Sequence, residues 1–303
     1  GDVGRHRLES QEKQKLIDKL RDVIARVQKS LQQENRRLVE LINKPLSEIK
    51  SLLPEDQMVY ANLKYNAENR IQELNNLYTS PFFVKCELEI SSTKEKKILY
   101  FAKHHFSDEL IYSWVAPIAR IRFDKPGPVE YKLPNGITEK GILTHKEQYL
   151  IVDGKVVFFA IEDGDNPREL IYQEHFSSKK DGFILPEIVA VMEKAQDTVI
   201  RAHHVGPFVI SGPAGSGKTT LALHRVAFLV QAPDTAHIYP GESIIVLVQD
   251  NGTKEYFSHL LPELGIKNVR ITTFFEWASE ILGLEEAVYL DRRGKKKKKK
   301  DQI

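Results

Sequence analysis

Eight residues in the last third of the chain have the pattern of a phosphate-binding loop. The run from Gly212 to Thr219 matches G-x-x-x-x-G-K-[ST], and it stands between an apolar run and a stretch with helical periodicity. Glycines let the backbone wrap closely enough to aim its N–H groups at phosphate oxygens. The lysine of such a loop reaches the β- and γ-phosphates, and the following hydroxyl completes the shell of a Mg²⁺ ion. The pattern therefore predicts a site for a nucleoside triphosphate and Mg²⁺.

Two residues of this loop carry the predicted chemistry. We assign Lys218 to the phosphates and Thr219 to Mg²⁺, and we predict both as catalytic because they hold the phosphoryl group that is transferred. The helix that begins near Lys218 adds the positive end of its dipole. The residues predicted to contact the nucleotide here are Gly212, Pro213, Ala214, Gly215, Ser216, Gly217, Lys218, Thr219 and Thr220.

Two side chains upstream of the loop are candidates for recognising the base. Gln196 lies sixteen residues before Gly212, and Arg201 lies between them. A glutamine amide can donate to an adenine edge and accept from it at once, and an arginine plane can stack on the base. We therefore predict ATP as the nucleotide, with Gln196 and Arg201 at the adenine. The alternative is that both are ordinary exposed helix residues.

Helical and strand patterns alternate around the loop from about residue 184. The predicted strands are 207–211, 243–249 and 269–273, and the predicted helices are 185–204, 219–231, 253–264 and 274–282. This alternation predicts a parallel sheet with helices on both faces. After the loop we find no apolar run followed by Asp-Glu, the pair that holds Mg²⁺ and activates water, and Asp291 is the best substitute. We therefore expect an N-terminal piece of a longer protein that binds ATP and hydrolyses it poorly alone.

An amphipathic pattern over residues 8–79 predicts two long helices. Apolar side chains that alternate in spacing by three and four residues form a seam at Ile17, Leu20, Ile24, Val27, Leu31, Leu38 and Leu41. Pro45 favours the end of the first helix or a kink in it, and a second helical pattern covers about 55–78. Together they predict an antiparallel helical hairpin. The seam could pack within its own domain, or the hairpin could project and engage a partner.

Short runs with a period of two, rich in β-branched and aromatic residues, fill residues 82–161 and predict a small antiparallel β module. Asn135-Gly136 and Asp153-Gly154 favour two-residue hairpin turns. The predicted fold class is therefore α+β followed by α/β. The predicted parts are a helical arm (1–80), a β-rich module (81–175), part of a P-loop domain (176–290) and a basic, disordered tail (291–303).

Composition predicts a globular cytoplasmic protein without a membrane span. The chain is 41% hydrophobic and 28% charged, and no apolar run reaches the ~18 residues of a span. The single cysteine, Cys86, excludes an internal disulfide and a multi-cysteine zinc site. The last thirteen residues carry eight basic and two acidic side chains, so the other 290 residues have a formal net charge of −4. A nucleic-acid site in this body must be a local groove.

Residues 185–280 resemble superfamily 1 UvrD/Rep-like helicases. EKAQDTVIRAHHVGPFVISGPAGSGKTTLALHRVAFL is similar to the Q motif and motif I, and its LHR continuation looks like that of a helicase-IV-like branch that associates with bacterial RNA polymerase. IIVLVQDNGTKEYFSHLLPELGIKNV and ITTFFEWA look like motifs Ia and Ib. The hairpin and the β module resemble the N-terminal region of that branch. Ser113 and Val115 depart from its Asp-Trp-Arg-Ala-Pro segment.

This resemblance implies a RecA-like P-loop domain (helicase 1A), the first motor domain, and a chain that ends within it. It implies that Gln196 and Arg201 hold adenine and that Thr273 and Phe274 face single-stranded nucleic acid. It also implies a DNA helicase or translocase that couples ATP hydrolysis to movement on single-stranded DNA or RNA and remodels RNA polymerase, reached by the hairpin of residues 8–79.

Two other functions stay open on the sequence. One is a non-enzymatic module that binds RNA polymerase, in which the nucleotide only orders the fold. The other is an unrelated P-loop ATPase that a partner chain completes.

Overall fold

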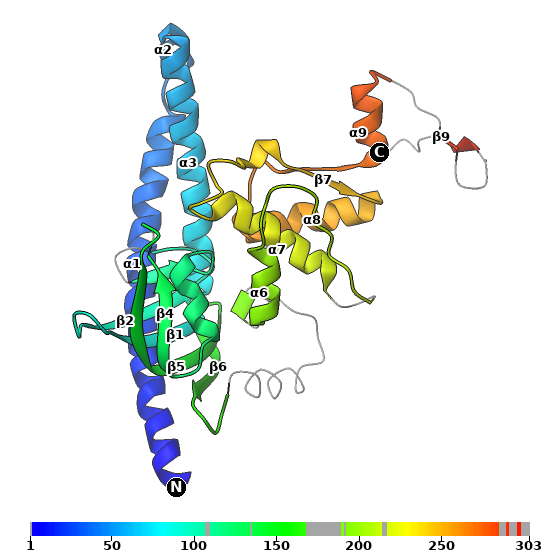
Figure 1. Ribbon diagram of the computed structural model, residues 1–303. Helices are drawn as coiled ribbons and strands as arrows, with labels where there is room; N and C mark the ends of the chain where they lie inside the picture. The colour runs from blue at the N-terminus through cyan, green and yellow to red at the C-terminus, as the bar shows by residue number, and fades with distance from the viewer. Residues whose placement is uncertain are drawn as a thin grey trace.

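The computed structural model describes residues 2–106, 110–133, 135–167, 189–190, 192–213, 217–284, 289–290 and 296–297. We call residues 2–79 the arm, residues 82–167 the β module and residues 192–284 the P-loop part (Figure 1). The predicted boundary between residues 175 and 176 lies outside the described residues. Asp291 and most of the predicted basic tail lie outside them as well.

The arm is a pair of long antiparallel helices, as the sequence predicted (Figure 1). Its helices are α1 (Asp2–Ile42), α2 (Leu46–Ser51) and α3 (Pro54–Thr79). Pro54 stands in the first turn of α3, where its missing N–H leaves no hydrogen bond unmade. Glu55 and Asp56 in the same turn favour the positive end of the helix dipole. The short helix α2 forms the tip, and the N-terminus lies at the opposite end.

The buried stripe of α1 is rotated from the predicted seam. Its fully buried side chains are Leu16, Leu20, Val23 and Val27. The predicted seam residue Ile24 is only partly buried. A seam with alternating spacings of three and four suits one neighbouring helix, whereas α1 packs against α3 and also against the sheet, where Phe82 and Tyr149 join the same core. The stripe therefore faces the groove between these two neighbours.

The β module is built on one six-stranded sheet. Its strands are β1 (Val84–Ile90), β2 (Lys96–Ala102), β3 (Ile111–Ser113), β4 (Gly127–Lys132), β5 (Thr138–Val152) and β6 (Lys155–Glu162). The order is β3-β2-β1-β5-β4, and β6 pairs with the second half of β5. The pairs are antiparallel except for β2 with β3, as the alternating pattern predicted for most of the module. The 3₁₀ helix η2 (Pro117–Phe123) follows β3.

One of the two predicted hairpin turns is confirmed. Asp153 and Gly154, with φ of 49° and 75°, join β5 to β6 as a two-residue turn. The prediction for Asn135-Gly136 is wrong, because the register pairs Lys132 with Thr138 and leaves five residues between the strands. The side chain of Asn135 accepts a hydrogen bond from the Ile137 N–H at 3.0 Å, which holds a longer loop instead.

The P-loop part combines helices with two parallel strands. Its elements are α6 (Lys194–Ile200), α7 (Lys218–Gln231), η3 (Gly241–Ser243), β7 (Ile245–Val248), α8 (Asn251–Glu263), β8 (Arg270–Thr273) and α9 (Phe274–Ile281). β7 and β8 pair in parallel. The strand predicted at 207–211 is wrong: these residues form no strand, and Val209 is 84% exposed. A strand needs a neighbour for its backbone hydrogen bonds, and no described strand pairs with this run.

The described residues thus form an α+β fold whose main sheet is mostly antiparallel. One core lies between the arm and the sheet. A second core runs from the sheet into the P-loop part and includes Trp114, Ile200 and Leu223. Two further short strands, β9 (Tyr289–Leu290) and β10 (Lys296–Lys297), pair with each other. Among the described residues, no helix has the length and apolar character that a membrane crossing requires.

Candidate nucleotide-binding site

The described part of the turn that leads into α7 includes one glycine with a left-handed backbone. Gly217 immediately precedes the helix with φ of 84°, a left-handed conformation that favours glycine. The first N–H groups of a helix have no acceptor within the helix, so they are available to an anion. Ala214, Gly215 and Ser216 lie outside the described residues.

Lys218 reaches back over the start of the loop. Its Nζ donates to the carbonyl oxygens of Gly212 at 2.6 Å and Pro213 at 2.8 Å. The ammonium is therefore held by the two residues that begin the loop, while the Lys218 backbone belongs to the first turn of α7. Its charge lies where the positive helix end and the loop glycines also favour an anion.

The two threonines after Lys218 occupy different environments. Thr219 is exposed on the first turn of α7, and Thr220 is half-buried. The Thr220 carbonyl is 2.7 Å from Nδ1 of the buried His224. Burial lowers the pKa of His224, so the ring is neutral and its Nδ1–H donates to that carbonyl. This hydrogen bond lies within α7, on its buried side, while Thr219 is exposed.

Gln196 belongs to the N-terminal cap of α6. Its Oε1 accepts a hydrogen bond from the Glu193 N–H at 2.9 Å, and the Glu193 side chain accepts in return from the backbone of Gln196. The side chain is half-buried. Its predicted contact with adenine stays a prediction, and that contact would have to replace or share the cap.

Arg201, at the end of α6, points to the β module. Its Nη2 donates to the carbonyl of Trp114 at 2.6 Å, and its Nη1 donates to that of Val115 at 3.2 Å. Its Nε lies 2.9 Å from a carboxylate oxygen of Asp197. Burial lowers the pKa of Arg201, and the adjacent Asp197 carboxylate opposes that shift. Its role at adenine also stays a prediction.

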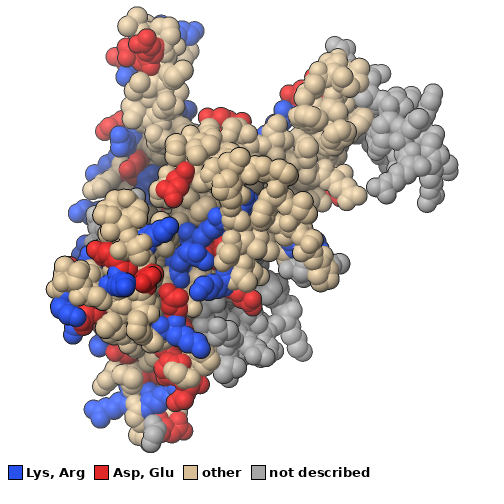
Figure 2. All heavy atoms as spheres, viewed as in Figure 1, with Lys and Arg blue, Asp and Glu red and all other residues tan. Residues whose placement is uncertain are grey.

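Thr273 and Phe274 lie where β8 passes into α9. The Thr273 hydroxyl accepts from the Glu276 N–H at 3.2 Å and caps the helix. Phe274 is 63% exposed, and its ring centroid lies 5.7 Å from that of Trp277. Exposed aromatic rings of this kind can stack nucleic-acid bases. Figure 2 shows a mostly uncharged surface over α8 and α9 and charges of both signs along the arm.

Arg225 is a further residue of the site, and its role was missed at the level of sequence. Its Nη1 donates to the carbonyls of Val199, Ile200 and Ala202, and its Nη2 donates to that of His203. The guanidinium also lies 4.2 Å from the centroid of the Phe208 ring. Arg225 thus ties α7 to the chain that leads from α6 to the loop. The LHR run of residues 223–225 was the available signal.

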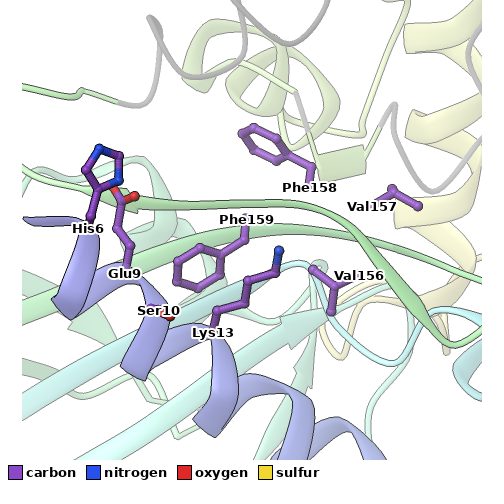
Figure 3. Close-up of a pocket in the computed structure, with 8 residues that line it drawn as sticks. All are labelled: His6, Glu9, Ser10, Lys13, Val156, Val157, Phe158 and Phe159. Atoms are coloured by element: carbon purple, nitrogen blue, oxygen red, sulfur yellow. The ribbon is translucent and has the colours of Figure 1, made fainter.

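Other hollows and charged clusters do not carry the same chemistry. Glu12, His145 and Glu147 offer ligand atoms within 4.8 Å of one another, but Nζ of Lys85 lies 3.7 Å from both carboxylates and already supplies a cation. A pocket of about 370 Å³ between α1 and β6 is lined by charged and apolar side chains (Figure 3). Another, of about 390 Å³, lies where the three parts meet and includes His104 and Gly265.

Comparison with known proteins finds one family. Residues 6–166 match the N-terminal domain of DNA helicase IV HelD. The match covers nearly all of the arm and the β module, and it stops before the P-loop part. Among curated proteins, no match to the chain was found.

Proposed function

The chain belongs to the family of N-terminal domains of DNA helicase IV HelD, and from this premise we propose that it includes the ATP-binding region of a UvrD-like superfamily 1 helicase. The parent enzyme couples ATP hydrolysis to movement on single-stranded DNA or RNA. This chain binds ATP and Mg²⁺ at Gly212 to Thr219 and hydrolyses ATP poorly alone.

The observation that carries this proposal is the geometry at the start of α7. Left-handed Gly217, the Lys218 ammonium folded over the loop and the accessible Thr219 hydroxyl all lie within one turn. These groups fit a triphosphate with Mg²⁺: Lys218 would hold the β- and γ-phosphates, and Thr219 would provide one oxygen to the metal ion. Mg²⁺ would neutralise the charge that develops on the phosphates.

The outer surface of the P-loop part fits a larger motor domain. Ile245 and Leu247 on β7 are 46% and 49% exposed. Strands of a parallel sheet are ordinarily covered on both faces. We infer that further strands and helices of a RecA-like domain cover this face in the parent enzyme, and that Thr273 and Phe274 lie toward the nucleic acid.

A binding titration with the wild-type chain and Lys218→Ala tests the nucleotide site. We expect ATP to bind the wild-type chain in the presence of Mg²⁺, and the variant to lose about 1.5–3 kcal/mol of binding free energy, the usual contribution of a hydrogen bond to a charged group. Isothermal calorimetry measures both.

The matched control is Lys140→Ala, since Lys140 is an exposed lysine on β5 with 74% of its side chain accessible. It should bind ATP like the wild-type chain. Equal ATP affinity in Lys218→Ala and Lys140→Ala would remove the nucleotide site, and turnover of ~1 s⁻¹ or more would contradict the expectation of poor hydrolysis.

The tip of the arm supports the second function, a module that binds RNA polymerase. Apolar side chains crowd this end and are more than half exposed: Val39, Ile42, Leu46, Leu53, Met58 and Val59. Exposed apolar groups gathered in one place mark a protein-interaction surface. Charges of both signs, Glu48 and Glu55 with Lys44 and Lys50, lie among them, so a partner surface with apolar and mixed charged groups would fit.

Variants at the tip test this function better than deletion of the arm, because residues 16–27 belong to the core under the sheet. We expect Leu46→Ser with Leu53→Ser to weaken capture of purified RNA polymerase at least tenfold, since two exposed anchors are lost. Ile137→Ser, at an apolar residue of the β module that is also more than half exposed, is the control. Unchanged capture by the tip variant would exclude the tip as the contact.

A further inference from the structure

A short segment of the β module contacts both helices that flank the candidate nucleotide loop. Trp114, Val115 and Ala116 follow β3, and their carbonyls accept hydrogen bonds from Arg201 of α6 at 2.6, 3.2 and 3.4 Å. The Trp114 ring lies 6.0 Å from that of His224 on α7, centroid to centroid. The loop from Gly212 to Gly217 lies between α6 and α7 in the chain.

A buried carboxylate joins the two parts at this junction. Asp197 is fully buried, and its carboxylate lies 2.9 Å from Nε of Arg201 and 3.2 Å from Nε of Arg120. Arg120 comes from η2 of the β module, so the charges span both parts. A buried carboxylate is stable only when partners compensate it, and removal of one partner leaves a charge uncompensated.

The same contacts occupy the Arg201 guanidinium. A guanidinium has five N–H donors in one plane. Here they serve three carbonyls and one carboxylate, and one face of the plane lies 5.2 Å from the centroid of the Phe228 ring. Only 12% of the side chain is exposed. An arginine held in this way has few contacts left for a base.

We propose that Arg201 is a positioning residue that couples the β module, and the arm packed on it, to the nucleotide loop. The inference rests on the proposed nucleotide site. Arg201 holds the segment 114–116 against α6. The contact between the Trp114 and His224 rings holds the same segment against α7. Nucleotide binding and the state of this junction then influence each other equally, as linkage between two sites requires.

Arg201→Ala and the milder Arg201→Lys test the proposal in the full chain. The lysine keeps a charge for Asp197, but its three donors on one atom cannot replace contacts to three carbonyls and a carboxylate. We expect both variants to lose affinity for ATP and GTP by the same factor, about tenfold for alanine, which lies within the usual range of coupling between sites. Arg270→Ala, which removes an arginine paired with Glu280 on the surface, should bind like the wild-type chain.

Fluorescence of Trp114 supplies the readout that a purely structural role would not change. With Trp277→Phe as background, Trp114 is the remaining tryptophan. We expect saturating ATP to change its emission in the wild-type background and to leave it unchanged in Arg201→Lys, even when the loop is saturated. Loss of ATP affinity with GTP affinity retained would show a contact with the base and overturn the proposal.

An emission change of equal size in Arg201→Lys would also overturn it. If the wild-type chain bound neither nucleotide, the proposed function itself would fail, and this inference with it. If the wild-type chain bound both nucleotides and the Arg201 variants bound them equally well, only the coupling would fail.

Discussion

The β module buries a charged side chain, whereas the P-loop part exposes apolar ones. In the β module, Lys146 is fully buried, yet its Nζ lies 2.9 Å from a Glu162 oxygen and donates to the carbonyls of Arg122 and Asp124. In the P-loop part, Ile245 and Leu247 of β7 are about half exposed. The first region pairs its buried charge within itself, whereas the second leaves apolar surface for other protein segments or ligands to cover.

The largest expected effect in this comparison is the loss of the buried lysine. Lys146→Met keeps the size of the side chain but leaves the buried Glu162 without its cation. We expect unfolding free energy to fall by about 3–5 kcal/mol, the usual cost of breaking a buried ion pair. Urea unfolding followed by circular dichroism measures it, with Lys140→Met as the exposed control. A loss below about 1 kcal/mol would show that the network is not needed.

The next effect compares apolar side chains of the two regions. Leu74 of α3 is fully buried in the core between arm and sheet, so Leu74→Ala should cost about 2–5 kcal/mol. Leu247→Ala, at a side chain 49% exposed, should change stability by no more than about 0.5 kcal/mol. Urea unfolding of both variants checks the contrast. Similar losses would mean that the face of β7 is already covered.

A smaller effect should appear with pH. Burial, followed by the charges of Lys103 and Arg70, lowers the pKa of His104 to about 3. The unfolded chain binds a proton near pH 6.5 and the folded chain does not, so this residue reduces stability as pH falls from about 6.5 toward 3. We expect His104 to account for a loss of about 2 kcal/mol between pH 7 and 5.

His104→Gln should remove that part of the pH dependence, while His259→Gln, at an exposed position, should not. His145 acts with the opposite sign. A hydrogen bond to Glu147 at 2.5 Å raises the pKa of His145, so its contribution is present at low pH and is lost as pH rises through the folded pKa. The same pH dependence in wild type and His104→Gln would exclude the burial of His104 as its cause.

Local sequence patterns predicted many of the helices and strands, but few of the contacts between the parts of the molecule. The helices of the arm follow from apolar spacing, and the turn at Asp153-Gly154 follows from its need for positive φ. The run 207–211 has the composition of a buried strand, but only pairing decides such a strand. The contacts of Arg201 with Trp114 and Val115 join residues more than eighty positions apart, which periodicity does not predict.

The candidate site shows the same division. Lys218 and Gly217 were predicted because their pattern is local and their chemistry depends on one turn. The network of Lys85, Glu12 and Glu147 was not predicted, because its members come from three separate elements. Arg225 was accessible only through the resemblance of the LHR run, and its hydrogen bonds to four carbonyls depend on the path of the chain after α6.

The arm is buried at one part of its length and projects at the other, so a force at its tip acts with a long lever. In α1 the fully buried side chains end at Val27, and in α3 they begin at Ala67. The part of the arm that packs against the sheet is therefore held in place, and the part beyond it, which includes the tip, projects. A helix of 41 residues spans about 60 Å. A force on Leu46 would therefore act as a torque on the part of the arm that packs against the sheet. There the N–H of Gly154, in the turn Asp153-Gly154, donates a hydrogen bond to the carbonyl of Thr79.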